Sequence, residues 1–151
     1  GTAFSDSYVA QLQRYQSDRI RFLGYVYGDV LEELWSNAYF VVQPSTLEGL
    51  SISLLEGLSY GKCVLTSDIP ENMEVVGDAA PSFKSRDIED LKAKLKLLIE
   101  NPDLVRRYEA QSREVSRNYS WDRIVDSLER VYDQVVDLRT PTGDGAQLLP
   151  I

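Results

Sequence analysis

The segment at residues 43–58, QPSTLEGLSISLLEGL, constrains the fold of this chain more than any other, because it predicts a strand, a short loop and a helix in direct succession. The apolar run before it favours a β-strand and is ended by Pro44, which begins a turn. Leu54, Leu55 and Leu58 then recur at the spacing of one helix face. The first turn of such a helix carries free backbone N–H groups and the positive end of the helix dipole. The segment therefore predicts an anion site, and phosphate is the usual occupant of such sites.

Two carboxylates flank this predicted anion site, Glu48 at the mouth of the helix and Glu56 within it. Carboxylates repel phosphate at close range, but they accept hydrogen bonds well from paired hydroxyl groups. At a rise of about 1.5 Å per residue, a helical run from Glu48 to Glu56 would span about 12 Å, which is the separation that two sugars joined by a diphosphate need. A nucleotide sugar is therefore the first hypothesis for the ligand.

Composition removes several classes of function. A length of 151 residues suits one domain with a real core, and the formal net charge of −8 disfavours nucleic acid and anionic membrane surfaces as partners. The chain has no histidine, which excludes Ser-His-Asp and Cys-His catalysis within it. Its single cysteine, Cys63, excludes an internal disulfide and a multi-cysteine metal site, and its apolar neighbours predict a buried structural thiol. No metal site is predicted.

Strand and helix patterns alternate along most of the chain, which predicts an α/β fold: a Rossmann-like three-layer parallel sheet with helices on both faces and a helical C-terminus. Ligands bind beyond the carboxyl ends of the strands in such sheets, where the 43–58 loop would lie. The apolar residues of the last helix are expected to pack in the core. The expected strands are 19–24, 39–43, 63–67 and 79–83; the expected helices are 6–16, 29–35, a helix ending near 60, 71–76, one from 87, one from 102 and one from about 120 to 135.

The order of several motifs resembles the C-terminal, donor-binding domain of retaining glycosyltransferases of the GT-B fold (glycosyl transferases group 1, or family 4). The resemblance covers roughly residues 5–137. Two glutamates eight residues apart arise often by chance, but their place after a Pro-Ser loop and between these strands is specific. The motifs are RIRFLG at 19–24, YFVVQPS at 39–45, Glu48-Gly49, Glu56-Gly57, GKCVLT at 61–66 and Asn101-Pro102.

The resemblance implies roles for the residues around the helix mouth. Glu56 would hold the ribose hydroxyls of the nucleotide, and Glu48 would contact the donor sugar near its reacting carbon as the catalytic residue. The backbone N–H groups of Gly49, Leu50 and Ser51 would hold the diphosphate or the sugar. No metal or other cofactor is implied. Each glutamate could instead be a plain solvated residue of the helix.

The base of the nucleotide would be recognised by the loop after the 19–24 segment, where Tyr25, Val26 and Tyr27 are the candidates. A tyrosine at the rim of the domain with no ligand is the alternative interpretation of Tyr25. The resemblance does not identify the base, the sugar or the acceptor.

A domain of this type should open with two further strands before residue 5, and an N-terminal acceptor-binding domain should precede it. Both are expected to be missing from the chain, together with the Arg and Lys residues that neutralise the donor diphosphate. Exposed strand edges would then favour self-association or strand exchange. Residues 1–139 are thus predicted to be a partial nucleotide-sugar-binding domain, inactive alone, and 140–151 a loose tail.

The predicted function is to bind the donor for a retaining glycosyltransferase that acts on a glycan, lipid or small-molecule acceptor. The expected location is cytoplasmic. Peripheral contact with the inner membrane through the missing domain is a further possibility of this hypothesis. The alternatives are a non-catalytic nucleotide-binding module and a flavodoxin-like regulatory module.

Overall fold

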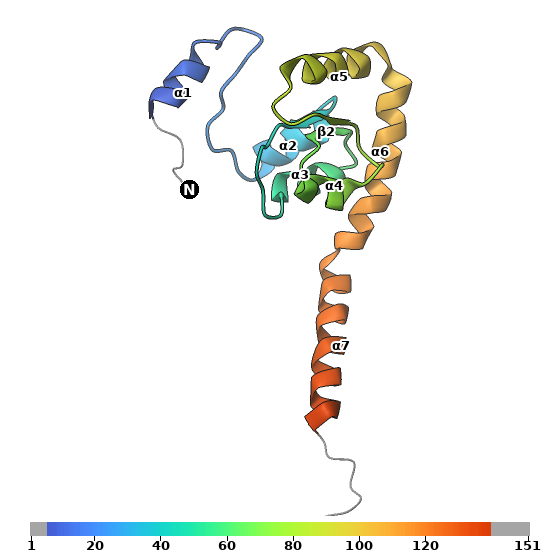
Figure 1. Ribbon diagram of the computed structural model, residues 1–151. Coiled ribbons are helices and arrows are strands. Elements are labelled where there is room, and N and C mark those ends of the chain that lie inside the picture. Colours follow the sequence, from blue (N-terminus) through green and yellow to red (C-terminus); the bar gives the residue numbers. More distant parts are fainter. Residues whose placement is uncertain (1–5, 140–151) are drawn as a thin grey trace, which may run out of the picture. The chain divides into compact units, whose positions relative to one another are not determined.

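The computed structural model describes residues 6–139, and these divide into two compact units with a boundary between Asn37 and Ala38. The first unit holds the helices α1 (Asp6–Gln13) and α2 (Asp29–Asn37). The second unit holds a sheet, its covering helices and a long final helix (Figure 1). The predicted tail at 140–151 lies outside the described residues, as do the first five residues.

The prediction of a strand at 19–24 is wrong. This segment runs between α1 and α2 without forming a strand, and its backbone bonds are local, such as those between Ser17 and Ile20. A strand needs a neighbour to accept and donate its backbone hydrogen bonds, and no segment among residues 6–139 pairs with this one. Phe22 and Leu23 remain exposed as a result.

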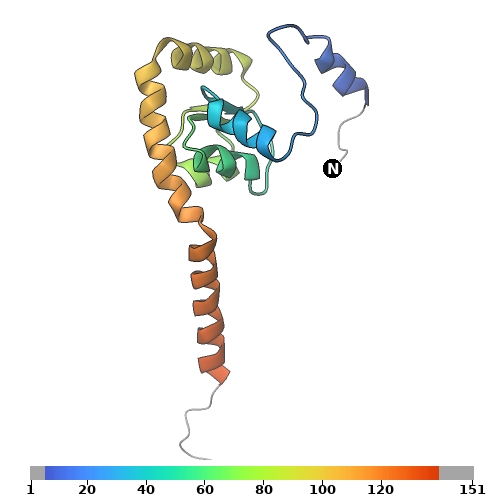
Figure 2. The same ribbon diagram turned by 180° about the vertical axis from the view of Figure 1, so that it is seen from behind.

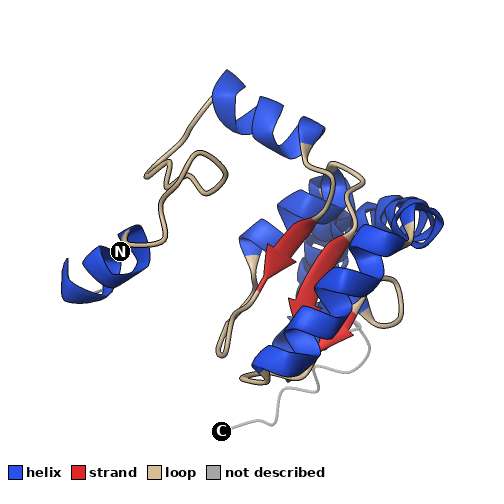
Figure 3. Cartoon of the chain, turned by 90° about the horizontal axis from the view of Figure 1, so that it is seen from above, coloured by secondary structure: helices blue, strands red, loops and turns tan. Residues whose placement is uncertain are grey.

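The second unit contains a parallel sheet of the strands β1 (Val41–Gln43), β2 (Val64–Ser67) and β3 (Ser82–Phe83). The strands lie side by side in the order β1-β2-β3 (Figure 3). In the register of the first pair, Val41 lies opposite Val64. The connecting helices are α3 (Ile52–Ser59) and α4 (Pro70–Val76), followed by α5 (Ile88–Glu100), α6 (Pro102–Ser116), a 3₁₀ turn η1 (Arg117–Tyr119) and α7 (Trp121–Arg139). The predicted α/β class with a parallel sheet is confirmed.

Each face of the sheet has its own apolar core, because successive strand residues point to opposite sides. Val64 faces α3 and α4, where it packs with Leu54, Leu58, Val75 and Val76. Leu65 faces α5 and α6, where it packs with Cys63, Phe83, Leu98 and Val105. The helices lie on both sides of the strands (Figures 2 and 3). The predicted three layers are therefore present in this unit.

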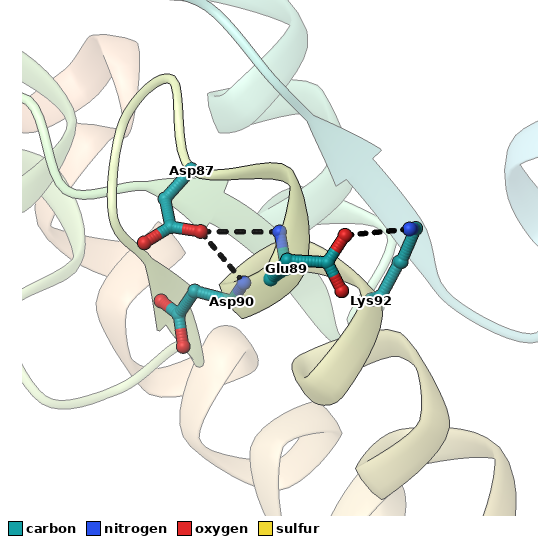
Figure 4. Close-up of polar contacts among 4 residues, drawn as sticks. All are labelled: Asp87, Glu89, Asp90 and Lys92. Atoms are coloured by element: carbon teal, nitrogen blue, oxygen red, sulfur yellow. Dashed lines mark hydrogen bonds and ion pairs between the residues drawn. The ribbon is translucent and has the colours of Figure 1, made fainter.

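The helix boundaries follow the capping residues of the sequence. Asp87 precedes α5, and its Oδ1 accepts hydrogen bonds from the backbone N–H groups of Glu89 at 3.1 Å and Asp90 at 3.0 Å (Figure 4). In the same turn, Lys92 Nζ pairs with Glu89 Oε1 at 2.7 Å. Pro102 opens α6, where its missing N–H is harmless. The helix starts expected at 87 and 102 are confirmed.

Strand β3 is shorter than the expected 79–83. Pro81 has no N–H to donate, although its carbonyl accepts from Thr66 at 3.1 Å. Ala79 donates instead to Val76 in a turn that closes α4. Pairing with β2 is therefore confined to Ser82 and Phe83.

The expectation that the apolar residues of the last helix are buried is wrong within the described residues. Helix α7 keeps its predicted helical period, but Trp121 is 79% exposed and Tyr132 62%. The sheet and its two cores end before α7, so the apolar stripe has no described element to pack against. The other members of the stripe are Ile124, Val125, Leu128, Val131 and Val135, each between 44% and 53% exposed.

Candidate functional site

The connection from β1 to α3 forms the candidate site, at the carboxyl edge of the parallel sheet. Ser51 caps α3 with extended backbone angles, and its Oγ accepts from the backbone N–H of Leu54 at 3.3 Å. The backbone N–H groups of residues 49–53 donate to no atom within the described range 6–139. The helix mouth thus offers unpaired donors at its positive end, as the sequence predicts. Gly49 and Leu50 are exposed here, while Ser51 is buried.

Glu48 is held in place by two neighbours, Ser45 on the same loop and Gln43 at the end of β1. Its Oε1 accepts hydrogen bonds from Ser45 Oγ and from Gln43 Nε2, the latter at 3.0 Å. Its second carboxylate oxygen, Oε2, makes no hydrogen bond to the described residues. The carboxylate is half-buried and enters the site already oriented, with one oxygen left for a ligand.

The estimate of separation from a continuous helix is wrong, because α3 begins only at Ile52. Residues 48–51 form the loop and the cap, so Glu48 lies outside the helix and Glu56 in its second turn. The two carboxylates still lie on either side of the helix mouth in sequence. Their separation depends on the loop and not on helical rise alone.

Glu56 has a different environment from Glu48. Its side chain is half-buried and makes no hydrogen bond or ion pair to residues 6–139. It lines a hollow of about 180 Å³ between α3 and the end of α6, together with Ser59 of α3, Ser116 and Tyr119. Ser116 and Tyr119 are absent from the residues predicted for the site. They come from a distant part of the chain, and no local pattern connects them to Glu56.

Tyr25, Val26 and Tyr27 lie in the first unit, between Gly24 and Gly28. Both glycines have positive φ angles, 66° and 60°, which other residues rarely adopt. The rings of Tyr25 and Tyr27 are parallel to within 5°, with centroids 6.3 Å apart, and both are more than 70% exposed. These rings are available to a planar ligand. Glu48 and Glu56, by contrast, belong to the second unit.

Cys63 is fully buried in the sheet core beside β2. Burial raises the pKa of its thiol to about 12, and the negative charge of Glu109 adds to the effect. The thiol is therefore protonated and inert at neutral pH, as a structural cysteine should be.

Within residues 6–139, no group of three or more His, Cys, Asp or Glu side chains is close enough together to bind a metal ion. Over the same residues, none of the helices combines the length and the apolar character needed to cross a membrane.

Comparison with known families agrees with this geometry. The pattern that defines the family Glycosyl transferases group 1 matches residues 5–115, which is most of the described chain. The chain belongs to this family, and the expected resemblance to the C-terminal domain of GT-B glycosyltransferases is confirmed.

Similar curated proteins include O-antigen chain mannosyltransferase B from Escherichia coli, 28% identical over 113 residues, 75% of this chain and 30% of that protein. A second is N,N'-diacetylbacillosaminyl-diphospho-undecaprenol alpha-1,3-N-acetylgalactosaminyltransferase from Campylobacter jejuni, 28% identical over 129 residues, 84% of this chain and 34% of that protein. The chain thus spans about a third of the length of these relatives.

Solved structures share the fold at lower identity. Sucrose-phosphate synthase from Thermosynechococcus elongatus has a TM-score of 0.77 and 20% identity, and the match covers 87% of this chain and 34% of the other. A glycosyltransferase from Rickettsia africae has a TM-score of 0.70 and 17% identity, with 89% and 35% covered. At these identities the likeness supports the fold alone.

Proposed function

We propose that this chain binds the nucleotide-diphosphate sugar of a retaining glycosyltransferase. The observation that carries the proposal is the mouth of α3, where unpaired backbone N–H groups lie between an oriented carboxylate, Glu48, and an unpaired one, Glu56. Backbone donors suit a diphosphate, and carboxylates suit the hydroxyl groups at its two ends. Membership of the glycosyl transferases group 1 family supports this ligand class.

Each part of the donor has a proposed partner. Glu56 accepts hydrogen bonds from the ribose hydroxyls, and Gly49, Leu50 and Ser51 hold the diphosphate or the sugar through their backbone N–H groups. Glu48 orients the donor sugar near its reacting carbon through its available oxygen, Oε2. The base is assigned to Tyr25, Val26 and Tyr27 of the first unit, where the rings of Tyr25 and Tyr27 are exposed.

In a retaining transfer, the acceptor hydroxyl attacks from the face that the diphosphate leaves. The bond from the sugar carbon to the diphosphate oxygen breaks while the bond to the acceptor oxygen forms, and the proton of the acceptor hydroxyl passes to the departing diphosphate. The positive end of α3 lowers the energy of the negative charge that builds on the leaving diphosphate. Glu48 contributes by orientation, and no metal is invoked in this proposal.

The acceptor is proposed to be a glycan, a lipid or a small molecule held by an N-terminal domain outside this chain. The relatives named above include enzymes whose names specify sugar transfer to O-antigen and to a diphospho-undecaprenol acceptor. A cytoplasmic location with peripheral membrane contact, and self-association of the isolated chain, stay predictions.

The ribose assignment is tested with Glu56→Ala in the intact protein. Loss of a carboxylate that accepts charge-assisted hydrogen bonds, at about 1.5–3 kcal/mol each, should weaken binding of UDP, GDP or ADP by about 10- to 100-fold. Calorimetric titration with the three nucleotides and their hexose derivatives measures this. Unchanged nucleotide affinity in Glu56→Ala would show that the ribose assignment is wrong.

Two further variants make the test specific. Glu74→Ala removes an exposed carboxylate of α4 that has no ion pair within residues 6–139, and its nucleotide affinity should equal that of the wild type. Glu48→Gln should keep nucleotide affinity within a few-fold while lowering donor turnover. If the wild type binds the nucleotide but turns over no donor, the non-catalytic nucleotide-binding alternative is favoured.

A further inference from the structure

Asn72 is a fully buried amide in the second unit. It lies on α4 beside Val75 and Val76, and its exposed fraction is 0%. Burying an amide is unfavourable unless its hydrogen bonds are replaced, and Asn72 Oδ1 has no partner within the described residues. An apolar residue of similar size would remove that penalty. The position therefore calls for an explanation beyond core packing.

The amide of Asn72 is turned toward Ser67, the last residue of β2. Its Nδ2 donates to Ser67 Oγ at 3.1 Å and lies 3.4 Å from Ser67 O. Ser67 Oγ in turn donates its only proton to the backbone carbonyl of Ser45. Both atoms of Ser67 near the amide are thus acceptors, which fixes the NH₂ side of Asn72 toward them. Ser67 is itself only 1% exposed.

Ser45 extends these contacts from the core to the site. Its carbonyl is held by Ser67, and its side-chain hydroxyl donates to Glu48 Oε1. Gln43 Nε2 also holds this part of the loop. It lies 2.8 Å from Ser45 Oγ, 3.0 Å from Glu48 Oε1 and 3.1 Å from Ser51 Oγ. A continuous set of hydrogen bonds therefore runs from buried Asn72 through Ser67 and Ser45 to Glu48.

We propose that Asn72 and Ser67 are positioning residues for the transfer reaction, which hold the 44–48 loop so that Glu48 presents Oε2 to the donor sugar. This inference rests on the proposed function. Because both residues are buried behind the loop, they act through Ser45 and Glu48 and touch no part of the donor. A loop without this support would have to become ordered each time a donor binds. Small misplacements of a group at the reacting centre lower the rate of the reaction strongly.

The experiment compares Ser67→Ala and Asn72→Ala with Val75→Ala in the intact protein. Ser67→Ala removes one hydroxyl and creates little space, so it should fold. Val75→Ala truncates a buried side chain of the same helix as Asn72 and touches none of the hydrogen bonds described above. Donor turnover is followed as release of UDP, GDP or ADP from their hexose and N-acetylhexosamine derivatives, and affinity for the free nucleotides is measured separately.

Positioning predicts that both polar variants lower kcat for donor turnover by about 10- to 100-fold while the dissociation constant for the free nucleotide stays within about twofold. Val75→Ala should lower the melting temperature yet keep kcat within about twofold of the wild type. If all three variants lose stability and keep kcat, the proposal is overturned and the polar residues are structural. Failure of the wild type to bind any of the nucleotides would instead contradict the proposed function itself.

Discussion

The two ends of α3 are built in opposite ways. At the C-terminal end, Gly61 takes a φ of 65°, Gly61 N donates to Leu58 O at 2.9 Å and Lys62 N donates to Gly57 O at 3.0 Å, which closes the last carbonyls in a Schellman motif. At the N-terminal end, Leu54 is the only one of the first amides that finds an acceptor among the described residues, in the side chain of Ser51. One end satisfies its own backbone and the other leaves donors unpaired.

This difference shows which end of the helix can bind a ligand. At the closed end, the carbonyls of Glu56, Gly57 and Leu58 accept hydrogen bonds from the backbone that follows, and the chain then enters the buried core at Cys63. The open end lies beside Gln43, Ser45 and Glu48, which are polar and partly accessible. Stability is thus concentrated at the closed end, while the open end retains groups that a ligand can satisfy.

The largest expected effect on stability is at the closed end. Gly61→Ala places a side chain at positive φ, and its Cβ would lie 2.5 Å from Arg113 Nε. Backbone strain of about 1–2 kcal/mol plus displacement of Arg113 should lower the free energy of unfolding by about 2–3 kcal/mol. Urea denaturation monitored by circular dichroism measures the loss.

A double-mutant cycle separates the two contributions. In an Arg113→Ala background the contact is gone, so Gly61→Ala should cost only the backbone strain, about 1–2 kcal/mol. Equal costs in both backgrounds would mean that Arg113 moves aside freely. A negligible cost in both would show that the C-terminal end of α3 does not depend on this motif.

A smaller loss is expected at the open end from Ser51→Ala. This variant removes the acceptor for the Leu54 N–H and one contact of Gln43, and loss of an N-cap typically costs about 1 kcal/mol. Ser53→Ala is the matched control, because Ser53 is exposed on the same helix and forms no hydrogen bond within residues 6–139. Thermal unfolding that shifts equally for both variants would contradict the capping role of Ser51.

The effect that is smallest at neutral pH concerns Cys63, because it develops only in alkaline solution. The native thiol keeps its proton up to a pKa of about 12, whereas the unfolded thiol releases it near 9, so rising pH favours the unfolded chain between these values and has no such effect below them. The free energy of unfolding should therefore fall more steeply from pH 9 to 10.5 in the wild type than in Cys63→Ala. Parallel curves would show that burial does not suppress ionisation of this thiol.

Much of the fold follows from local patterns in the sequence. Pro44 and the leucine spacing of 54–58 predict the turn and helix that form the site, Asp87 and Pro102 mark helix starts, and Gly61 marks a helix end. These features succeed because each depends on backbone conformation or on neighbours within one or two turns. The open helix mouth and the two flanking glutamates are of this kind.

Tertiary structure decided the strand pairing, the burial and the hydrogen bonds that need residues distant along the chain. Within residues 6–139, segment 19–24 has the pattern of a strand but no partner to pair with, and the apolar stripe of α7 has a helical period but no core to enter. The support of Glu48 by Ser67 and Asn72, and the approach of Ser116 and Tyr119 to Glu56, likewise require the folded sheet. Sequence alone determined that a strand leads into an open helix mouth with two carboxylates. The packing of β2 and α4 beside that helix decided that Ser67 and Asn72 support the loop of Glu48, whereas the Glu56 side chain makes no hydrogen bond to residues 6–139. The physical reason is that hydrogen bonds between distant residues exist only once the core has brought their backbones together.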